Sequence, residues 1–67
     1  MPNMELLKDY IRESGMTTIA ISEKAGIDRA TIYNRLNNRG EWKASEIMGM
    51  TKALRLEPEE RDAIFLS

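Results

Sequence analysis

The side chains with the most specific chemistry lie close together in the middle of the chain, at Arg29, Ala30, Tyr33 and Asn34. An arginine can form two hydrogen bonds with guanine, an asparagine can do the same with adenine, and a methyl group can contact thymine. A tyrosine can reach either a base or a phosphate. These residue types can therefore recognise base edges if one structural element presents them together.

A helix over residues 29–37 would present them together. At 100° per residue, Ile32 and Leu36 point together into a core. The outward side then carries Ala30, Tyr33, Asn34 and Asn37, with Arg29 at its leading end. Taken singly, the arginine is better explained by a surface ion pair with Asp28 or Glu23, and the asparagine by a solvated helix position.

Positive charge is concentrated around the same stretch. The 67-residue chain has a formal net charge of −1, but residues 24–43 carry a surplus of +3, while the segments on either side each carry −2. The basic residues of this segment are Lys24, Arg29, Arg35, Arg39 and Lys43. Because a polyanion responds to the local field, an acidic chain can still hold a nucleic-acid-binding face. A solvated basic loop is the alternative explanation.

The residue inventory excludes several kinds of catalytic and metal site. The chain contains no His and no Cys, which excludes thiol nucleophiles, disulfides, Cys/His zinc sites and imidazole acid–base chemistry. The acidic cluster of Glu59, Glu60 and Asp62 fits the first turn of a helix better than a carboxylate site. We therefore expect no enzyme activity, no cofactor, no metal and no small-molecule substrate. No apolar run approaches the roughly 20 residues of a membrane span and no signal-peptide pattern opens the chain, so we expect a cytoplasmic domain.

Apolar periodicity and capping residues predict a single all-α domain over residues 1–67, a compact bundle of five short helices. The predicted helices span residues 4–14, 18–25, 29–37, 44–54 and 58–66. Asn3, Thr17 and Asp28 are the expected N-caps of the first three helices. Gly15 and Gly26 are expected to end the first two, because glycine tolerates the left-handed conformation that closes a helix.

The helix over residues 44–54 has weaker local signals. Lys43 is a poor N-cap, although Glu46 is placed to reach back to the start of the helix. Gly49 stands in mid-helix, where it lowers stability by about 1 kcal/mol relative to Ala. The local sequence alone therefore makes this the least certain of the helices.

Large apolar residues in the second half of the chain are expected to pack in the core or against a partner. Trp42, the single Trp, is expected to anchor the loop before it to the core. Ile64, Phe65 and Leu66 form a cluster larger than one face of a short helix can bury. Some of this cluster could pack on a second subunit of a homodimer; alternatively, Ile64 and Phe65 complete the core of a monomer and Leu66 lies outside it.

The segment 17–38, TTIAISEKAGIDRATIYNRLNN, contains two predicted helices joined by a short turn that begins at Gly26. It resembles the helix-turn-helix of the phage repressor and Cro family, the XRE-like class of transcriptional regulators. The likeness covers nearly the whole chain and continues through Leu36-Asn37, Trp42, Glu46-Ile47 and residues 54–61. The sequence departs from the family pattern at Ser22, where Ala is usual, at Asn38, where Gly is common, and at Lys43, where Ser or Thr would cap.

The resemblance implies that the helix over residues 29–37 lies in the major groove of double-stranded DNA. The expected base contacts are Arg29, Ala30, Tyr33 and Asn34. The expected phosphate contacts are Thr17 and Thr18 at a helix start, and Asn37, Arg39 and Lys43 after the groove-binding helix. The resemblance adds weight to Thr18 in particular. Arg35 and Lys24 are expected to add to the field without direct contact, and the alternative for Arg39 and Lys43 is a role as solubilising loop charges.

The function implied is that of a sequence-specific DNA-binding transcription regulator. A phage or prophage-type repressor of this kind binds a palindromic operator as a homodimer. The alternative is a protein-interaction module that keeps the helical core without binding DNA. The acidic total charge and the acidic helix over residues 58–66 favour that alternative.

Overall fold

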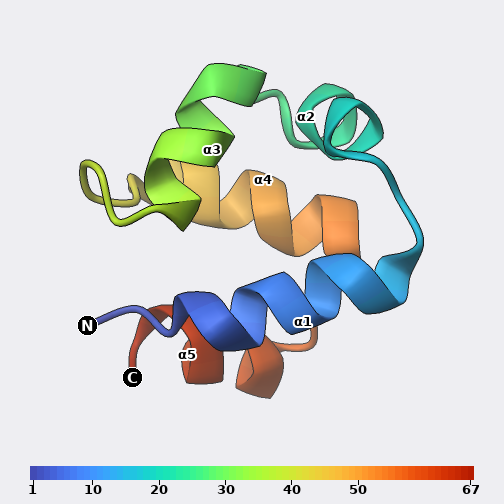
Figure 1. Ribbon diagram of the computed structural model, residues 1–67. Coiled ribbons are helices and arrows are strands. Elements are labelled where there is room, and N and C mark those ends of the chain that lie inside the picture. The colour runs from blue at the N-terminus through green and yellow to red at the C-terminus, as the bar shows by residue number, and fades with distance from the viewer.

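The computed structural model describes residues 1–67 as five α-helices and contains no strand (Figure 1). The helices are α1 (Met4–Ser14), α2 (Thr18–Ala25), α3 (Arg29–Leu36), α4 (Ala44–Leu54) and α5 (Pro58–Phe65). The predicted all-α architecture of five short helices is confirmed. Two boundaries are wrong by one residue, because α3 and α5 end at Leu36 and Phe65, before Asn37 and Leu66.

Local capping explains most of the helix limits. The side chains of Asn3 and Thr17 accept hydrogen bonds from the N–H groups of Leu6 and Ala20, each at 3.1 Å. Gly15 and Gly26 close α1 and α2 in the left-handed conformation, with φ of 71° and 70°. These caps satisfy backbone groups that the helices leave unpaired. The expected cap Asp28 precedes α3 but makes no side-chain hydrogen bond to it.

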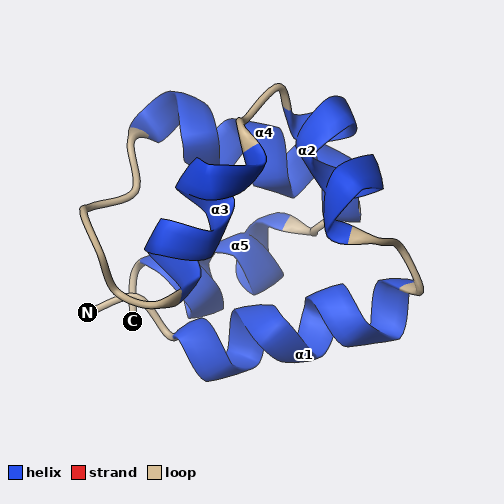
Figure 2. Cartoon of the chain, turned by 45° about the horizontal axis from the view of Figure 1, so that its top comes forward, coloured by secondary structure: helices blue, strands red, loops and turns tan.

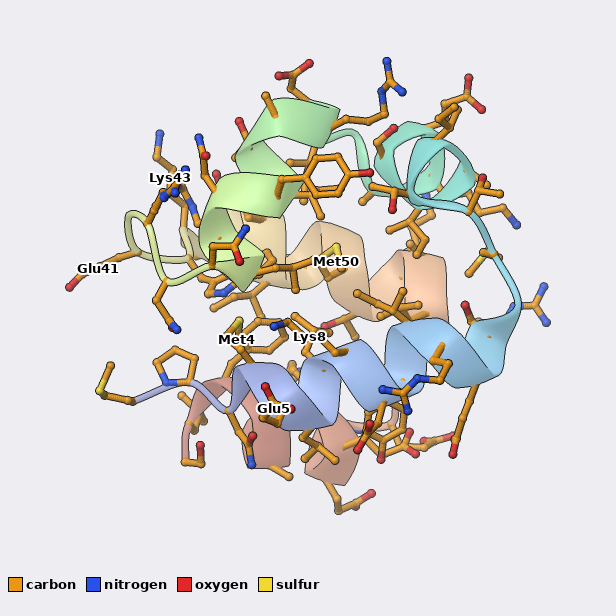
Figure 3. The ribbon with its side chains drawn as sticks, in the orientation of Figure 1. Met4, Glu5, Lys8, Glu41, Lys43 and Met50 are labelled. Carbon is orange, nitrogen blue, oxygen red and sulfur yellow. The ribbon has the colours of Figure 1, made fainter.

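Each helix contributes one completely buried side chain to the core: Leu7, Ile21, Ile32, Met50 and Ile64. α4 runs through the middle of the molecule and packs against α1, α2 and α5 (Figure 1). Figure 3 shows Met50 of α4 in the interior, between α3 and α1. Burial of an aliphatic side chain of this size stabilises the fold by about 1.5–3 kcal/mol relative to exposure. The core therefore depends on all five helices at once.

The apolar cluster at the end of α5 is divided between the core and the surface. Ile64 and Phe65 are buried, whereas Leu66 is 74% exposed. The ring of Phe65 meets that of Trp42 edge to face, with centroids 5.2 Å apart and planes at 70°. Trp42 packs against the core cluster and so joins the loop before α4 to α5, as predicted. Ile64 and Phe65 thus complete the core of a single chain.

None of the five helices has the length and apolar character needed to cross a lipid bilayer.

Gly49 allows α4 to approach α2 closely. A Cβ atom built on Gly49 would collide with the backbone carbonyl oxygen of Ala25 and would lie 3.2 Å from its carbonyl carbon. Because the obstacle is backbone at the end of α2, it cannot move aside as a flexible side chain would. The mid-helix glycine, unfavourable for the isolated helix, is therefore required by the packing of α2 on α4.

We predict that Gly49→Ala destabilises the protein by about 1–3 kcal/mol, the usual cost of overpacking. Helix propensity alone predicts the opposite sign, a gain of about 1 kcal/mol. Urea unfolding followed by the fluorescence of Trp42 measures the difference. Met48→Ala in the same helix is the matched control, because Met48 is exposed and its replacement should change stability by less than about 0.5 kcal/mol. A Gly49→Ala protein as stable as the wild type would contradict the packing explanation.

Candidate nucleic-acid interface

The turn between α2 and α3 is fixed by backbone hydrogen bonds. The N–H groups of Gly26 and Ile27 both donate to the carbonyl of Ser22, at 2.9 and 3.1 Å. Ile27 in the turn is buried together with Ile21 of α2 and Ile32 of α3. The hydroxyl of Ser22 donates to the carbonyl of Ile19 at 2.8 Å, which satisfies this polar side chain within its own helix. The α2–turn–α3 unit is thus held by one apolar cluster and by the carbonyl of Ser22, which accepts two hydrogen bonds.

α3 lies at the surface of the molecule, and the views in Figures 1 and 2 agree that no other helix covers its outer side. Its inner side carries buried Ile32 and half-buried Leu36. The four predicted base-contacting residues, Arg29, Ala30, Tyr33 and Asn34, are all exposed. The structure therefore brings these four residues to one accessible helix, with the inward and outward sides that the periodicity predicted.

Arg29 and Tyr33 are accessible in a form suited to binding. Arg29 forms no ion pair with Asp28 or Glu23, since neither lies within salt-bridge distance. The surface ion pair considered from the sequence is thus not formed, and all the guanidinium donors remain free. Tyr33 is 51% exposed. Both side chains can meet a ligand without first breaking a contact within the protein.

The start of α2 contains the first set of predicted phosphate contacts. Thr17 is the N-cap, and its hydroxyl oxygen is already occupied by the N–H of Ala20. Thr18, the first residue of the helix, is half-buried. The N–H groups in the first turn of a helix have no intrahelical partner and favour an anion. Thr17 therefore offers a phosphate its hydroxyl proton, and Thr18 its backbone N–H.

The second set, Asn37, Arg39 and Lys43, follows α3 in the loop of residues 37–43 that leads to α4. All three residues are exposed. The side-chain nitrogen Nδ2 of Asn37 donates to the carbonyl of Tyr33 at 2.9 Å. This side chain therefore already takes part in the C-terminal end of α3. Arg39 and Lys43 form no ion pair. Figure 3 shows Lys43 and its neighbour Glu41 projecting outward from this loop.

Arg35 is not the field-contributing cation that the sequence suggested. Its Nε donates to Oε1 of Glu46 at 3.0 Å and its Nη2 donates to Oε2 at 3.2 Å. Its remaining terminal nitrogen, Nη1, donates to the carbonyl of Arg39 at 3.1 Å. The side chains of Arg35 and Glu46 are only 15% and 11% exposed. Their charges cancel locally, so Arg35 adds little to the field around α3.

Glu46 serves two structural purposes at once. Its Oε1 also accepts a hydrogen bond from the N–H of Lys43 at 3.0 Å, which confirms the predicted cap of α4. Burial of the carboxyl by itself raises its pKa, but hydrogen bonds from Arg35 and from the Lys43 N–H, together with both positive charges, outweigh burial. The pKa of Glu46 therefore lies below its ordinary value.

Two residues of the acidic cluster in α5, Glu60 and Asp62, have partners within the protein. Glu60 accepts a hydrogen bond from the N–H of Glu57 at 2.7 Å and so caps α5. Asp62 pairs with Arg61 at 3.0 Å. No group of three or more acidic side chains is arranged to hold a metal ion. Glu59 and Glu60 lie in the first turn of α5, as predicted, whereas Asp62 follows that turn.

A search of protein-family models, curated proteins and solved structures finds no significant match to this chain.

We predict that Glu46→Gln lowers the stability of the protein at neutral pH by about 2–3 kcal/mol. Removal of one partner from a fully buried ion pair costs about 3–5 kcal/mol, and the small remaining exposure of this pair reduces that figure. Glu41→Gln, in the exposed loop nearby and without an ion pair, is the matched control and should be nearly neutral. Urea unfolding at pH 7 compares the two variants.

The same pair of variants tests the pKa of Glu46. A carboxyl whose pKa is lowered by folding stabilises the protein above its ordinary pKa of 4.5, and this contribution disappears as the pH falls through the lower folded value. Between neutral pH and strong acid, the wild type and Glu41→Gln should therefore lose stability more steeply than Glu46→Gln. Parallel stability profiles for all three proteins would contradict a lowered pKa.

Proposed function

We propose that this chain is a sequence-specific DNA-binding transcription regulator in which α2 and α3 form a helix-turn-helix and α3 enters the major groove. The observation that carries the proposal is the free outer side of α3, where Arg29, Ala30, Tyr33 and Asn34 are all exposed. The major groove of B-DNA is about 12 Å wide and admits one α-helix. Arg29 would pair with a guanine and Asn34 with an adenine.

The phosphate contacts proposed for this domain flank α3. Thr17 and Thr18 stand at the start of α2, before the turn, and Asn37, Arg39 and Lys43 follow the end of α3. Contacts on both sides of an inserted helix fix its depth and direction in the groove. The unpaired positive charges of Arg39 and Lys43 support their assignment to this role over that of simple loop charges.

The resemblance to phage repressors and Cro proteins extends the proposal to the type of regulator. We propose a phage or prophage-type repressor that binds a palindromic operator as a homodimer, with half-sites separated by about one helical turn of DNA. Repression would be steric, because a bound dimer covers the promoter. The cytoplasmic location expected from the sequence belongs to the same proposal.

A protein-interaction module remains the competing function. The acidic first turn of α5, with Glu59 and Glu60, and the net charge of −1 favour it. The two functions differ in their response to salt. A domain that neutralises phosphates loses DNA affinity as salt rises, whereas an interaction module binds little DNA even at low salt.

We predict that selection from a random duplex-DNA library yields a palindromic consensus for the wild type. Arg29→Ala should lose the preference for guanine at one position of each half-site, since a bidentate arginine–guanine pair is worth about 1–3 kcal/mol of discrimination. Arg12→Ala, which removes the same charge from α1, is the matched control and should keep the full consensus. If the protein retains DNA without any consensus, the outer residues of α3 do not read bases. If it retains no DNA at low salt, this chain alone does not bind DNA.

We predict a different effect for the loop cations. Arg39→Ala and Lys43→Ala should weaken binding to all DNA sequences alike and should each reduce the salt slope of log affinity by about 1. Lys52→Ala is the control, because it removes an exposed positive charge from the last turn of α4, at the other end of that helix from Lys43. Fluorescence anisotropy titrations at several salt concentrations measure the slopes. Equal slopes for wild type and both loop variants would assign Arg39 and Lys43 to solubility instead.

A further inference from the structure

We propose that Arg35 and Glu46 are a positioning pair for the DNA-binding face: they hold the loop of residues 37–43 against the end of α3 so that Arg39 and Lys43 meet the phosphates, although neither member of the pair touches DNA. The inference rests on the proposed function. Charge alone would give neither Glu46 nor the neutralised Arg35 a part in DNA binding.

Three of the five N–H donors of Arg35 already form hydrogen bonds within the protein. Three of its nitrogen atoms bond to Glu46 and to the carbonyl of Arg39, and the side chain is 15% exposed. The two N–H groups left over belong to a side chain with little exposed surface, so Arg35 is poorly placed to bind a phosphate. Arg35 therefore acts from inside the protein, despite its place in the middle of the basic segment.

The pair connects three parts of the interface. Arg35 lies in the last turn of α3, Arg39 in the middle of the loop, and Lys43 at the start of α4. The backbone of Arg39 is held on both sides, since its N–H donates to the carbonyl of Asn34 at 2.7 Å and its own carbonyl accepts from Arg35. The N–H of Lys43 is held by Glu46. The side chains of Arg39 and Lys43, the proposed phosphate contacts, are thus both attached to backbone that the same ion pair holds in place.

The conformation of the loop is fitted around Arg35. Asn38 and Gly40 both have positive φ, 61° and 81°. A Cβ atom on Gly40 would collide with Nη1 of Arg35 and would lie 3.2 Å from its Cζ. The loop therefore closes directly over the guanidinium, and the positions of loop and ion pair depend on each other.

The sign of the effect on DNA affinity separates positioning from charge. Glu46→Gln removes a negative charge close to the proposed interface, so charge alone predicts tighter DNA binding. Positioning predicts weaker binding and a smaller salt slope, because the contacts of Arg39 and Lys43 are lost together. Each phosphate contact contributes about 0.9 to the slope. Loss of both should therefore lower the slope by about 1.8 and the affinity at 0.1 M salt by more than about tenfold.

Glu41→Gln is the matched control, since it makes the same charge change in the adjoining loop without breaking an ion pair. It should bind labelled random-sequence duplex DNA as tightly as the wild type or more tightly. Arg35→Lys keeps the net charge but cannot make the three-way contact, and it should weaken binding like Glu46→Gln. Circular dichroism establishes the temperature at which each variant is folded, and all titrations are made below it.

Amide hydrogen exchange provides the readout independent of DNA. Exchange at Lys43 and Arg39 should quicken in Glu46→Gln and Arg35→Lys relative to Glu41→Gln, while exchange in α1 stays slow. Normal or tighter DNA binding by both pair variants would overturn the positioning inference and leave the proposed function standing. A wild-type chain that binds no duplex at low salt would overturn the proposed function, and the inference with it.

Discussion

The ion pair between Arg35 and Glu46 fixes the end of α3 to the start of α4, and the outer surface of the domain depends on it. α3 contributes a single completely buried side chain, Ile32, and packs chiefly on α2. A helix of eight residues is too short to be stable alone. Desolvation of the two charges is offset because the carboxylate receives three hydrogen bonds, two from Arg35 and one from the Lys43 N–H. In a domain of this size, where little core is available, the pair gives α3 an attachment to α4 in addition to the packing of Ile32 and Leu36.

The parts of the fold that could be predicted from the sequence are those set by near neighbours along the chain. Asn3 and Gly15 mark the limits of α1 through contacts within a few residues. The partner of Glu46 and the reason for Gly49 could not be predicted in this way. Arg35 stands eleven positions before Glu46 on another helix, and no periodicity relates them. Gly49 faces the backbone of α2, which local propensity does not describe. In both cases the missing information was the distance between two helices.

In the candidate site too, some features could be predicted from near neighbours along the chain and others could not. Exposure of Tyr33 and burial of Ile32 follow from helical periodicity once the helix is recognised. The free state of Arg29 does not, because the residue taken alone favours an ion pair with Asp28 or Glu23, which the structure does not contain. Arg35 and Arg39 look alike as loop-proximal cations, yet one is neutralised by Glu46 and the other is unpaired. Only the three-dimensional arrangement distinguishes a cation that holds the surface together from one that is free to bind.

The distribution of charge explains how a chain with net charge −1 can present a face suited to a polyanion. Figure 1 places α3 on the side of the molecule opposite α1 and α5, and Figure 3 shows the acidic Glu5 on α1, away from Lys43. The molecule measures 26 × 23 × 19 Å, whereas charge interactions through solution at 0.1 M salt decay over about 10 Å. Acidic groups on α5 are thus largely screened from a ligand at α3, whereas Glu5 of α1 lines the same hollow as Leu36 and Asn38 at the end of α3. Because Glu46 cancels Arg35 inside the fold, the field at this face comes from four unpaired cations and two exposed carboxylates: Lys24, Arg29, Arg39, Lys43, Asp28 and Glu41. Their positions, and not their sum with distant carboxylates, decide what the face attracts.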